Sequence, residues 1–309
     1  CVMSFEDSEG YLIGELNEGL TAMFSMMNTE RIAVGLQGLG QAEIAYQNAL
    51  AYAKDRIQGR DLKGPKNPDD EADPLIVHPD IRRMLMRSKA LIDSGRMLAS
   101  WTALSIDKSE KDPDPKVRKE HNDLVELMTP IIKALLTDYG VEITSEMMQV
   151  FGGHGYIKEY GMEQFYRDVR IAPIWEGTNG IQALDLAGRK MPQNMGRLLR
   201  RFFHPALEFI DDNKDDVNMK EFVEPFGKAL KGLQKTTLYM AQKGLSNPYE
   251  IGAAATDYLR QFGLVAMGYM WLLMLKVAYA KKDTDSYYEH KIITARFFFE
   301  RILPETLSR

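Results

Sequence analysis

Residues 149–179 read QVFGGHGYIKEYGMEQFYRDVRIAPIWEGTN and contain the two most informative features of this chain. The first is a glycine turn, in which Gly152, Gly153 and Gly155 permit positive φ and let backbone amides approach a ligand closely. The second is Glu176, which stands two residues before a threonine able to cap a following helix. Backbone just ahead of a helix is irregular, so a carboxylate at this position is free to face a ligand.

Apolar residues precede Glu176 from Ile171 to Trp175. Apolar neighbours desolvate a carboxylate and so strengthen it as a general base. A solvated loop glutamate fits the same local pattern, and the residues alone leave both interpretations open. The glycine turn also allows two interpretations: it could hold a phosphate, or its glycines could serve only the geometry of a turn between helices. It is not a dinucleotide fingerprint, since no strand is expected before it.

Apolar residues recur every three or four positions through most of the chain after Leu16, which predicts a mainly helical protein. Helices are expected over residues 18–58, 79–106 and 117–139. Gly140 is expected to separate the third helix from a fourth over 143–151. Four helices with short or medium connections favour an antiparallel bundle.

The ends of this bundle are marked by changes of pattern. Residues 11–16 read as a strand, and a short helix over 178–188 closes the unit before Pro192. Four further helices are then expected, over residues 193–211, 219–244, 248–282 and 286–303.

Composition narrows the class of protein. The chain has 309 residues, enough for about two domains, and 45% of them are hydrophobic and 27% charged, as in soluble globular proteins. A net charge of −5 argues against a nucleic-acid partner. Cys1 is the sole cysteine, which favours a reducing compartment and a cytoplasmic location.

Two further features limit the alternatives. The five histidines are scattered without the spacing of metal ligands, so no metal site is expected. The apolar run 262–280 is nearly long enough to span a bilayer, but it contains Lys276 and lies among amphipathic segments. It is therefore expected to be a buried helix and not a membrane span.

Taken together, residues 149–156, 167–171 and 175–181 resemble the C-terminal signature of the acyl-CoA dehydrogenases. The resemblance extends upstream through 28–31 and 55–58. From residue 191 onward the chain is similar to the helical domain that larger bacterial members append, the group that includes methylthiopropanoyl-CoA dehydrogenase-like enzymes. The resemblance implies an all-α fold with three parts: a remnant of a preceding β-domain (1–16), the family's C-terminal four-helix bundle (17–190) and an appended helical domain (191–309).

The resemblance also implies an activity. Family members are FAD-dependent dimers or tetramers that oxidise an acyl-CoA thioester to a trans-2-enoyl-CoA and pass electrons to an electron-transfer flavoprotein. Glu176 matches the family's base, which removes the α-proton as the β-hydride passes to the flavin. Its own backbone amide would donate to the thioester oxygen. Some relatives place the base at the position of Glu30, so Glu30 is the alternative.

Ligand contacts follow by motif match. FAD contacts are implied at Arg56, Gln58, Gln149, Gly152, Gly153 and Thr178. Substrate contacts are implied at Arg31, Trp175 and Gly177. This chain departs from the family after Arg56, where an aromatic residue is usual and none stands here. Many members have tyrosine before the base, and the larger Trp175 favours a shaped, shorter acyl pocket.

Other functions share parts of this pattern. An acyl-CoA oxidase has the same helical C-terminal architecture, and a non-catalytic flavoprotein relative or helical oligomerisation module would keep the helices without the chemistry. The resemblance places most flavin contacts in a middle β-domain that these residues do not include. The chain by itself is therefore expected to be inactive and to purify colourless.

Overall fold

The computed structural model describes residues 2–308, apart from the side chains at positions 24 and 25, so Cys1 and Arg309 lie outside it. Within this range the chain forms helices and no strand, and one isolated bridge pairs Ile57 with Pro74. The all-α prediction is confirmed. The strand expected over residues 11–16 is wrong, because a strand needs a partner for its backbone groups and the described chain offers none there.

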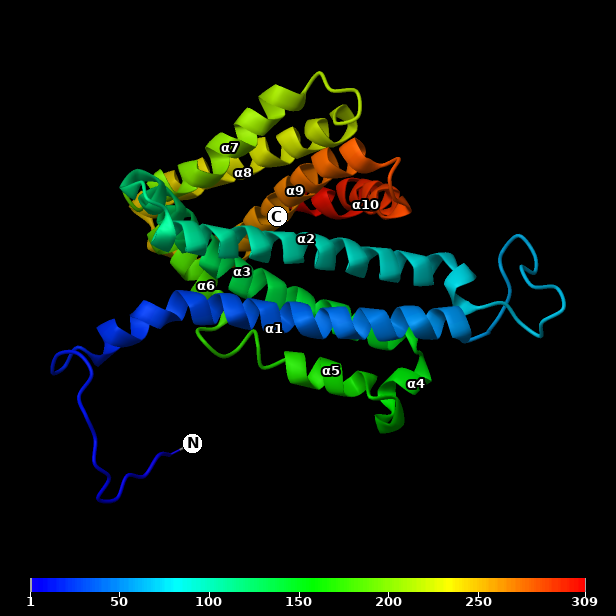
Figure 1. Ribbon diagram of the computed structural model, residues 1–309, viewed down its shortest axis with the longest axis horizontal. Coiled ribbons are helices and arrows are strands. Elements are labelled where there is room, and N and C mark those ends of the chain that lie inside the picture. Colours follow the sequence, from blue (N-terminus) through cyan, green and yellow to red (C-terminus); the bar gives the residue numbers. More distant parts are fainter. Residues whose placement is uncertain (1, 309) are drawn as a thin grey trace.

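Three long helices form the first unit: α1 (Gly19–Asp55), α2 (Pro79–Lys111) and α3 (Pro115–Val150). They lie alongside one another, and α3 packs against both α1 and α2 (Figure 1). Prolines at the first helical positions of α2 and α3 suit their starts, since a proline has no amide to leave unpaired. Asp114 caps α3 by accepting from the amide of Lys116 at 2.8 Å.

The break predicted at Gly140 is wrong, because α3 continues through it to Val150. Gly140 instead lies where α3 is in close contact with α1. A Cβ added there would stand 2.9 Å from the carbonyl oxygen of Gly38 on α1. Glycine in a helix costs about 1 kcal/mol relative to alanine, and here it permits two helix backbones to touch. Packing between helices therefore outweighed the local signal.

Short elements follow α3 and run back along the bundle. They are α4 (Gly153–Tyr156), η2 (Lys158–Tyr160), α5 (Met162–Val169), α6 (Asn179–Leu184) and the π-helical η3 (Asp185–Lys190). Because α5 packs against α1 and α3, the chain reverses between the glycine turn and α6 (Figure 1). The glycine turn and Glu176 are at most 24 residues apart in the sequence, but the turn lies beside Tyr52 of α1 and Glu176 lies on the turn beside Arg31 of α1.

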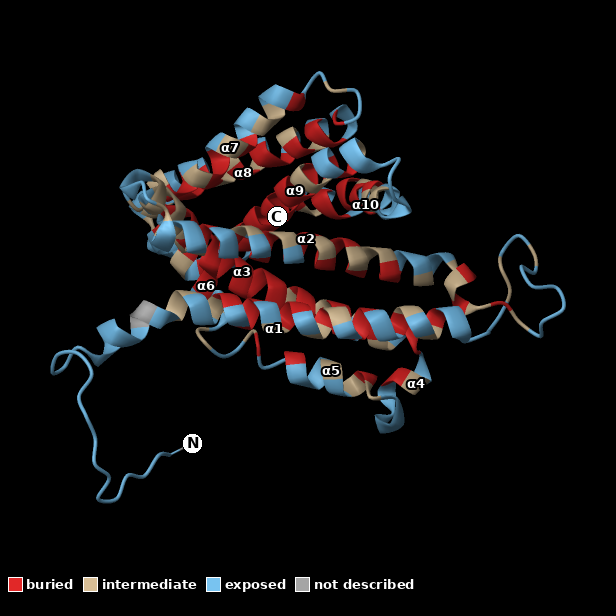
Figure 2. Cartoon of the chain, in the orientation of Figure 1, coloured by how far each residue is buried: buried red, intermediate tan, exposed pale blue. Residues whose placement is uncertain are grey.

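The second unit contains α7 (Arg197–Asn213), α8 (Lys220–Ser246), α9 (Pro248–Lys281) and α10 (Ser286–Phe297), followed by η4 (Phe298–Ile302) and η5 (Leu303–Leu307). Helix α9 packs against α8 and α10 on one side and against α2, α3 and α6 on the other. Its residues 261–272 are all buried (Figure 2). By length and composition α9 could cross a membrane, but 72% of its most apolar window is buried inside the protein. It is a core helix, as expected from its neighbours in the sequence.

Candidate functional site

The glycine turn follows directly from the end of α3. Gly152 has φ 58° and ψ −139°, a conformation open to glycine and to few other residues. A Cβ at Gly155 would collide with the carbonyl oxygen of Met148, so that glycine is required for close packing. Gly153 has neither constraint, and a Cβ there would meet nothing within 4 Å. The turn therefore presents bare backbone to open space at Gly152 and Gly153.

A cleft of about 330 Å³ lies beside this turn. The end of α1 and the following loop form one wall, and the end of α3 forms the other. The cleft brings together five of the six residues predicted to contact FAD: Arg56, Gln58, Gln149, Gly152 and Gly153. Ligand pockets start at roughly this volume, so the cleft could hold part of a larger ligand.

Aromatic contacts hold the turn against α1. The Tyr52 hydroxyl and His154 Nδ1 are 2.8 Å apart, and the Tyr52 ring stacks on Phe151 with centroids 4.0 Å apart. His154 also stacks on Tyr160. His154 thus helps to fix the turn against α1.

The loop that carries Gln58 is organised by Asp73, a residue that the sequence reasoning missed. Asp73 is fully buried, and its carboxylate accepts from the backbone amides of Asn67, Asp61 and Lys66, each at 2.9 Å. The Asn67 amide, with the other two amides and the Arg60 guanidinium, lowers the pKa of Asp73 to about 2 against the effect of burial. The Asp73 backbone also pairs with Gln58 and Gly59. The signal in the sequence that could have identified Asp73 is the Asp73-Pro74 pair at the end of a polar loop.

Glu176 lies in a second place, on the turn between α5 and α6. Its φ is +54° and that of Gly177 is +81°. A positive φ is costly for a glutamate, on the order of 1 kcal/mol or more. The side-chain amide of Gln182 stabilises the turn by donating to the carbonyl oxygens of Glu176 at 3.3 Å and Gly177 at 3.1 Å. Thr178 caps α6 as predicted, its hydroxyl accepting from the Ile181 amide at 3.4 Å.

The apolar residues before Glu176 are more exposed to solvent than the sequence indicated. Ile171, Ile174 and Trp175 are 44%, 49% and 45% exposed, and only Ala172 of the expected apolar wall is buried. The turn lies on the surface of the bundle, so these side chains have no second layer to pack against. Within the described residues, no hydrogen bond engages the backbone amide of Glu176.

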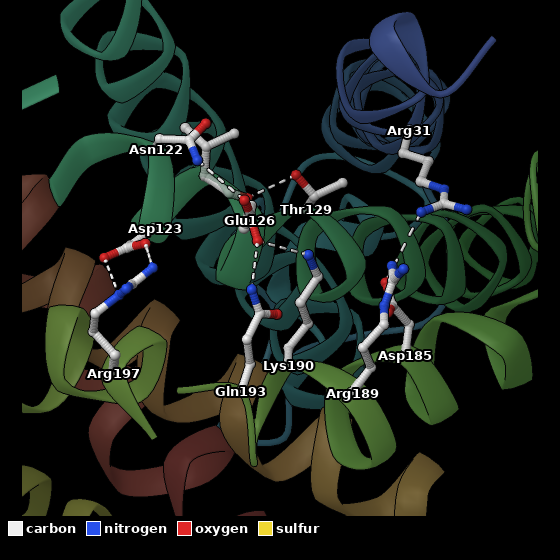
Figure 3. A network of polar contacts seen from close by, with 11 residues as sticks. Arg31, Asn122, Asp123, Glu126, Thr129, Asp185, Arg189, Lys190, Gln193 and Arg197 are labelled. Atoms are coloured by element: carbon white, nitrogen blue, oxygen red, sulfur yellow. Dashed lines mark hydrogen bonds and ion pairs between the residues drawn. The ribbon is translucent and has the colours of Figure 1, made fainter. Parts of the chain in front are cut away.

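Arg31 of α1 is the cation beside this turn. Its Nη2 lies 3.7 Å from where a Cβ on Gly177 would stand. Its Nη1 is 3.9 Å from Asp185, which Arg189 also engages (Figure 3). Glu30, the alternative base, is exposed on the neighbouring position of α1.

The predicted site residues therefore form two groups. Arg56 stands at the end of α1, with the cleft residues around it. Glu176, Gly177 and Thr178 gather near Arg31 instead. At the rise of an α-helix, Arg31 and Arg56 are roughly 37 Å apart along α1. The structure does not bring Thr178 to the cleft with the other predicted FAD contacts.

A larger hollow, of about 660 Å³, lies elsewhere, between the start of α2 and η4 with η5. Arg82, Arg83, Arg87 and Arg301 line it together with apolar residues. No residue singled out in the sequence lines this hollow.

Two family models match the chain. The one described as "Acyl-CoA dehydrogenase, C-terminal domain" matches residues 17–191, and the one described as "Acetyl-CoA dehydrogenase C-terminal like" matches residues 202–309. The chain therefore belongs to the acyl-CoA dehydrogenase family, whose members depend on FAD.

Individual relatives agree with this assignment. The 3-methylmercaptopropionyl-CoA dehydrogenase of Ruegeria pomeroyi is 37% identical over 309 residues, covering 99% of this chain and 52% of the relative. The broad-specificity linear acyl-CoA dehydrogenase FadE5 of Mycobacterium tuberculosis is 31% identical, covering 96% and 51%. A crystal structure of an acyl-CoA dehydrogenase complexed with FAD from Bacillus anthracis has a TM-score of 0.75 at 21% identity, covering 96% of this chain and 50% of that one. The chain spans about half the length of the curated relatives it matches.

The cleft at the glycine turn fits part of an FAD molecule. Open space at Gly152 and Gly153 leaves room for a phosphate or ribityl group against bare backbone. The Arg56 side chain has no ion pair among the described residues and lines the same cleft. A guanidinium beside exposed amides is a suitable partner for a pyrophosphate.

Proposed function

We propose that the protein to which this chain belongs is an FAD-dependent acyl-CoA dehydrogenase that converts an acyl-CoA thioester to a trans-2-enoyl-CoA, with Glu176 as the base. The observation that carries the proposal is the Glu176 turn. A glutamate is held at positive φ on a braced turn beside Arg31, and its own backbone amide has no hydrogen-bond partner among the residues that the structure describes. Bound FAD would accept the β-hydride.

The groups of this turn would each have a separate role in the reaction. The Glu176 carboxylate removes the α-proton of the thioester, and its amide donates to the thioester carbonyl oxygen, where negative charge develops. Trp175 is half-exposed beside the base and limits the acyl chain to a short one.

The separation of the two groups implies an oligomer. The distance of roughly 37 Å along α1 is longer than an extended FAD, so Arg56, Gln58, Gln149, Gly152 and Gly153 would hold the FAD of a neighbouring subunit. Thr178, next to Glu176, would contact the FAD at its own base. We therefore propose a homodimer or homotetramer. Its electron acceptor would be an electron-transfer flavoprotein, and its location would be cytoplasmic.

Glu176→Gln and Glu30→Gln in the full-length protein test the base, assayed with acyl-CoA substrates of different chain lengths and a dye acceptor. We expect Glu176→Gln to lose about 10²- to 10⁴-fold in kcat and Glu30→Gln to stay within about tenfold of wild type. Retained activity in Glu176→Gln would show that the base lies elsewhere. Peroxide release in place of dye reduction would identify an oxidase.

A further inference from the structure

Lys133 is a buried cation that the proposed reaction has not used. It lies on α3 and none of its side chain is exposed. Lysine is almost never fully buried unless it is paired. No carboxylate among the described residues lies within ion-pairing distance of Nζ, and its hydrogen bond goes to the side-chain oxygen of Asn179, at 2.9 Å. Burial of this kind needs a reason in the surrounding structure.

Asn179 connects Lys133 to the Glu176 turn. It is the first residue of α6, directly after Thr178, and its backbone amide donates to the carbonyl oxygen of Pro173 at 3.0 Å. Its side-chain NH₂ donates to Asp138 at 2.7 Å and to Thr137 at 2.9 Å. Asn179 thus closes the turn that runs from Pro173 to Thr178 and attaches it to α3.

Charged groups from several elements face Lys133. Burial lowers its pKa to about 8, while Asp138 of α3 and Glu176 of the turn favour the cation and Arg31 of α1 opposes it. Arg260 and Asp257 of α9 lie across a small enclosed cavity of about 90 Å³ that Asp138 and Asn179 also line. Lys133 therefore lies behind the turn, among charged groups that include the Glu176 carboxylate.

We propose that Lys133 is a positioning residue that holds the Glu176 turn from inside the bundle through Asn179, with its cation beneath the base. The inference rests on the proposed function. The Glu176 turn contains two successive residues at positive φ, and such strain persists only where the surroundings over-determine it. Gln182 supports the turn from α6, and the pair of Lys133 and Asn179 ties it to α3.

The first test compares Lys133→Met with Lys190→Met in the full-length protein. Lys190 is a matched control, because it is also buried but is paired with a carboxylate, that of Glu126 at 3.1 Å (Figure 3). We expect Lys133→Met to lower kcat about ten- to hundredfold because the base is misplaced, with KM changed less than about threefold.

Lys190→Met should leave both kcat and KM unchanged, even if it lowers the melting temperature. Lys133→Arg keeps the charge and should recover part of kcat. A folded Lys133→Met variant with wild-type kcat would overturn the positioning role. Wild-type protein that does not oxidise any acyl-CoA would instead sink the proposed function, and the second test would then decide the role of Lys133.

The second test measures hydrogen–deuterium exchange of residues 171–179 and does not depend on activity. Lys133→Met should exchange faster than wild type in this segment, and Lys190→Met should not. Should Lys133→Met fail to fold, Asn179→Ala removes the same connection and is measured in the same way. If residues 171–179 exchange at the wild-type rate in the folded variants, the connection that we propose does not exist.

Discussion

At Glu176 the backbone adopts a conformation that favours glycine, and the next residue is a glycine in the same region, at φ +81°. A Cβ on Gly177 would stand 2.7 Å from Nε2 of Gln182, which donates to the two carbonyl oxygens of this turn. The strained backbone of Glu176 and Gly177 is thus supported directly by one side chain, that of Gln182. This makes Gly177 the most sensitive small residue of the turn.

Gly177→Ala should therefore disturb the base without touching its carboxylate. We expect a loss of stability of about 1–2 kcal/mol from the positive φ and a fall in kcat on the order of tenfold to hundredfold from displacement of Glu176. Gly180→Ala is the control, because a Cβ there meets nothing within 4 Å. Thermal denaturation and dye-linked assays of both variants check this, and equal behaviour of the two would contradict it.

Asp73 provides a prediction about pH. Its folded pKa of about 2 is below the ordinary value of 3.8, so the ionised form is the one the fold stabilises. The contribution is fully present above about pH 4 and is lost as the pH falls from there toward 2. Proteolysis or hydrogen exchange of the loop 56–78 should show it opening over this range.

Asp73→Asn should open the same loop already at pH 7, because an amide oxygen cannot replace a carboxylate that accepts three backbone amides. Asp69→Asn, on an exposed position of the same loop, should leave it closed. Unchanged protection of the loop in Asp73→Asn would show that the carboxylate is not its anchor.

At the scale of elements, the contact of α1 with α3 depends on small residues. Gly38 of α1 faces α3, where a Cβ would stand 2.6 Å from the carbonyl oxygen of Leu136. Gly140 of α3 faces back toward Gly38, and Val169 of α5 covers the same point. A side chain at either glycine would separate the helices that place Arg31 beside the Glu176 turn.

Gly140→Ala should destabilise the protein although alanine is the better helix former. Its Cβ would stand 2.8 Å from Val169 and 2.9 Å from Gly38, and overpacking costs about 1–3 kcal/mol. Gly40→Ala, on the exposed side of α1 with nothing within 4 Å, should instead add up to about 1 kcal/mol. Chemical denaturation would show opposite signs for the two variants, and a stabilised Gly140→Ala would be inconsistent with the close contact.

At the scale of the whole molecule, charged residues join the second unit to the first. Arg260 of α9 contacts Glu142 of α3 at 2.7 Å, and Glu142 also receives Arg87 of α2 at 2.8 Å. The Arg260 guanidinium lies over the Tyr139 ring, 5.2 Å from its centroid. Three helices from both units therefore meet at one partly buried carboxylate, next to the cavity behind Asn179.

Arg260→Met should weaken this junction by about 1–3 kcal/mol, because Glu142 loses one of its two cations in a partly buried place. Arg296→Met is the comparison, since its ion pair with Glu221 is more than 40% exposed on both sides and should contribute about 1 kcal/mol or less. Urea denaturation of both proteins measures the difference. Equal losses would mean that the junction is no stronger than a surface pair.

Much of this protein was determined by sequence alone. The helices predicted over 79–106 and 248–282 occur at 79–111 and 248–281. These helices, the cap at Thr178 and the grouping of Gln149 with Gly152 and Gly153 depend on residues close together in the chain. Helical periodicity, capping and turn chemistry are local, so they are readable without a fold. The family motifs are local in the same sense.

Only the tertiary structure decided the remainder. It made α3 continuous through Gly140, buried Lys133 under the Glu176 turn, and separated the Glu176 turn from the cleft that Arg56 lines. Each of these depends on which distant residues are packed together, and a single glycine, lysine or glutamate has no local signature for that choice. The physical reason is that packing and burial energies between helices exceed the propensities of single residues.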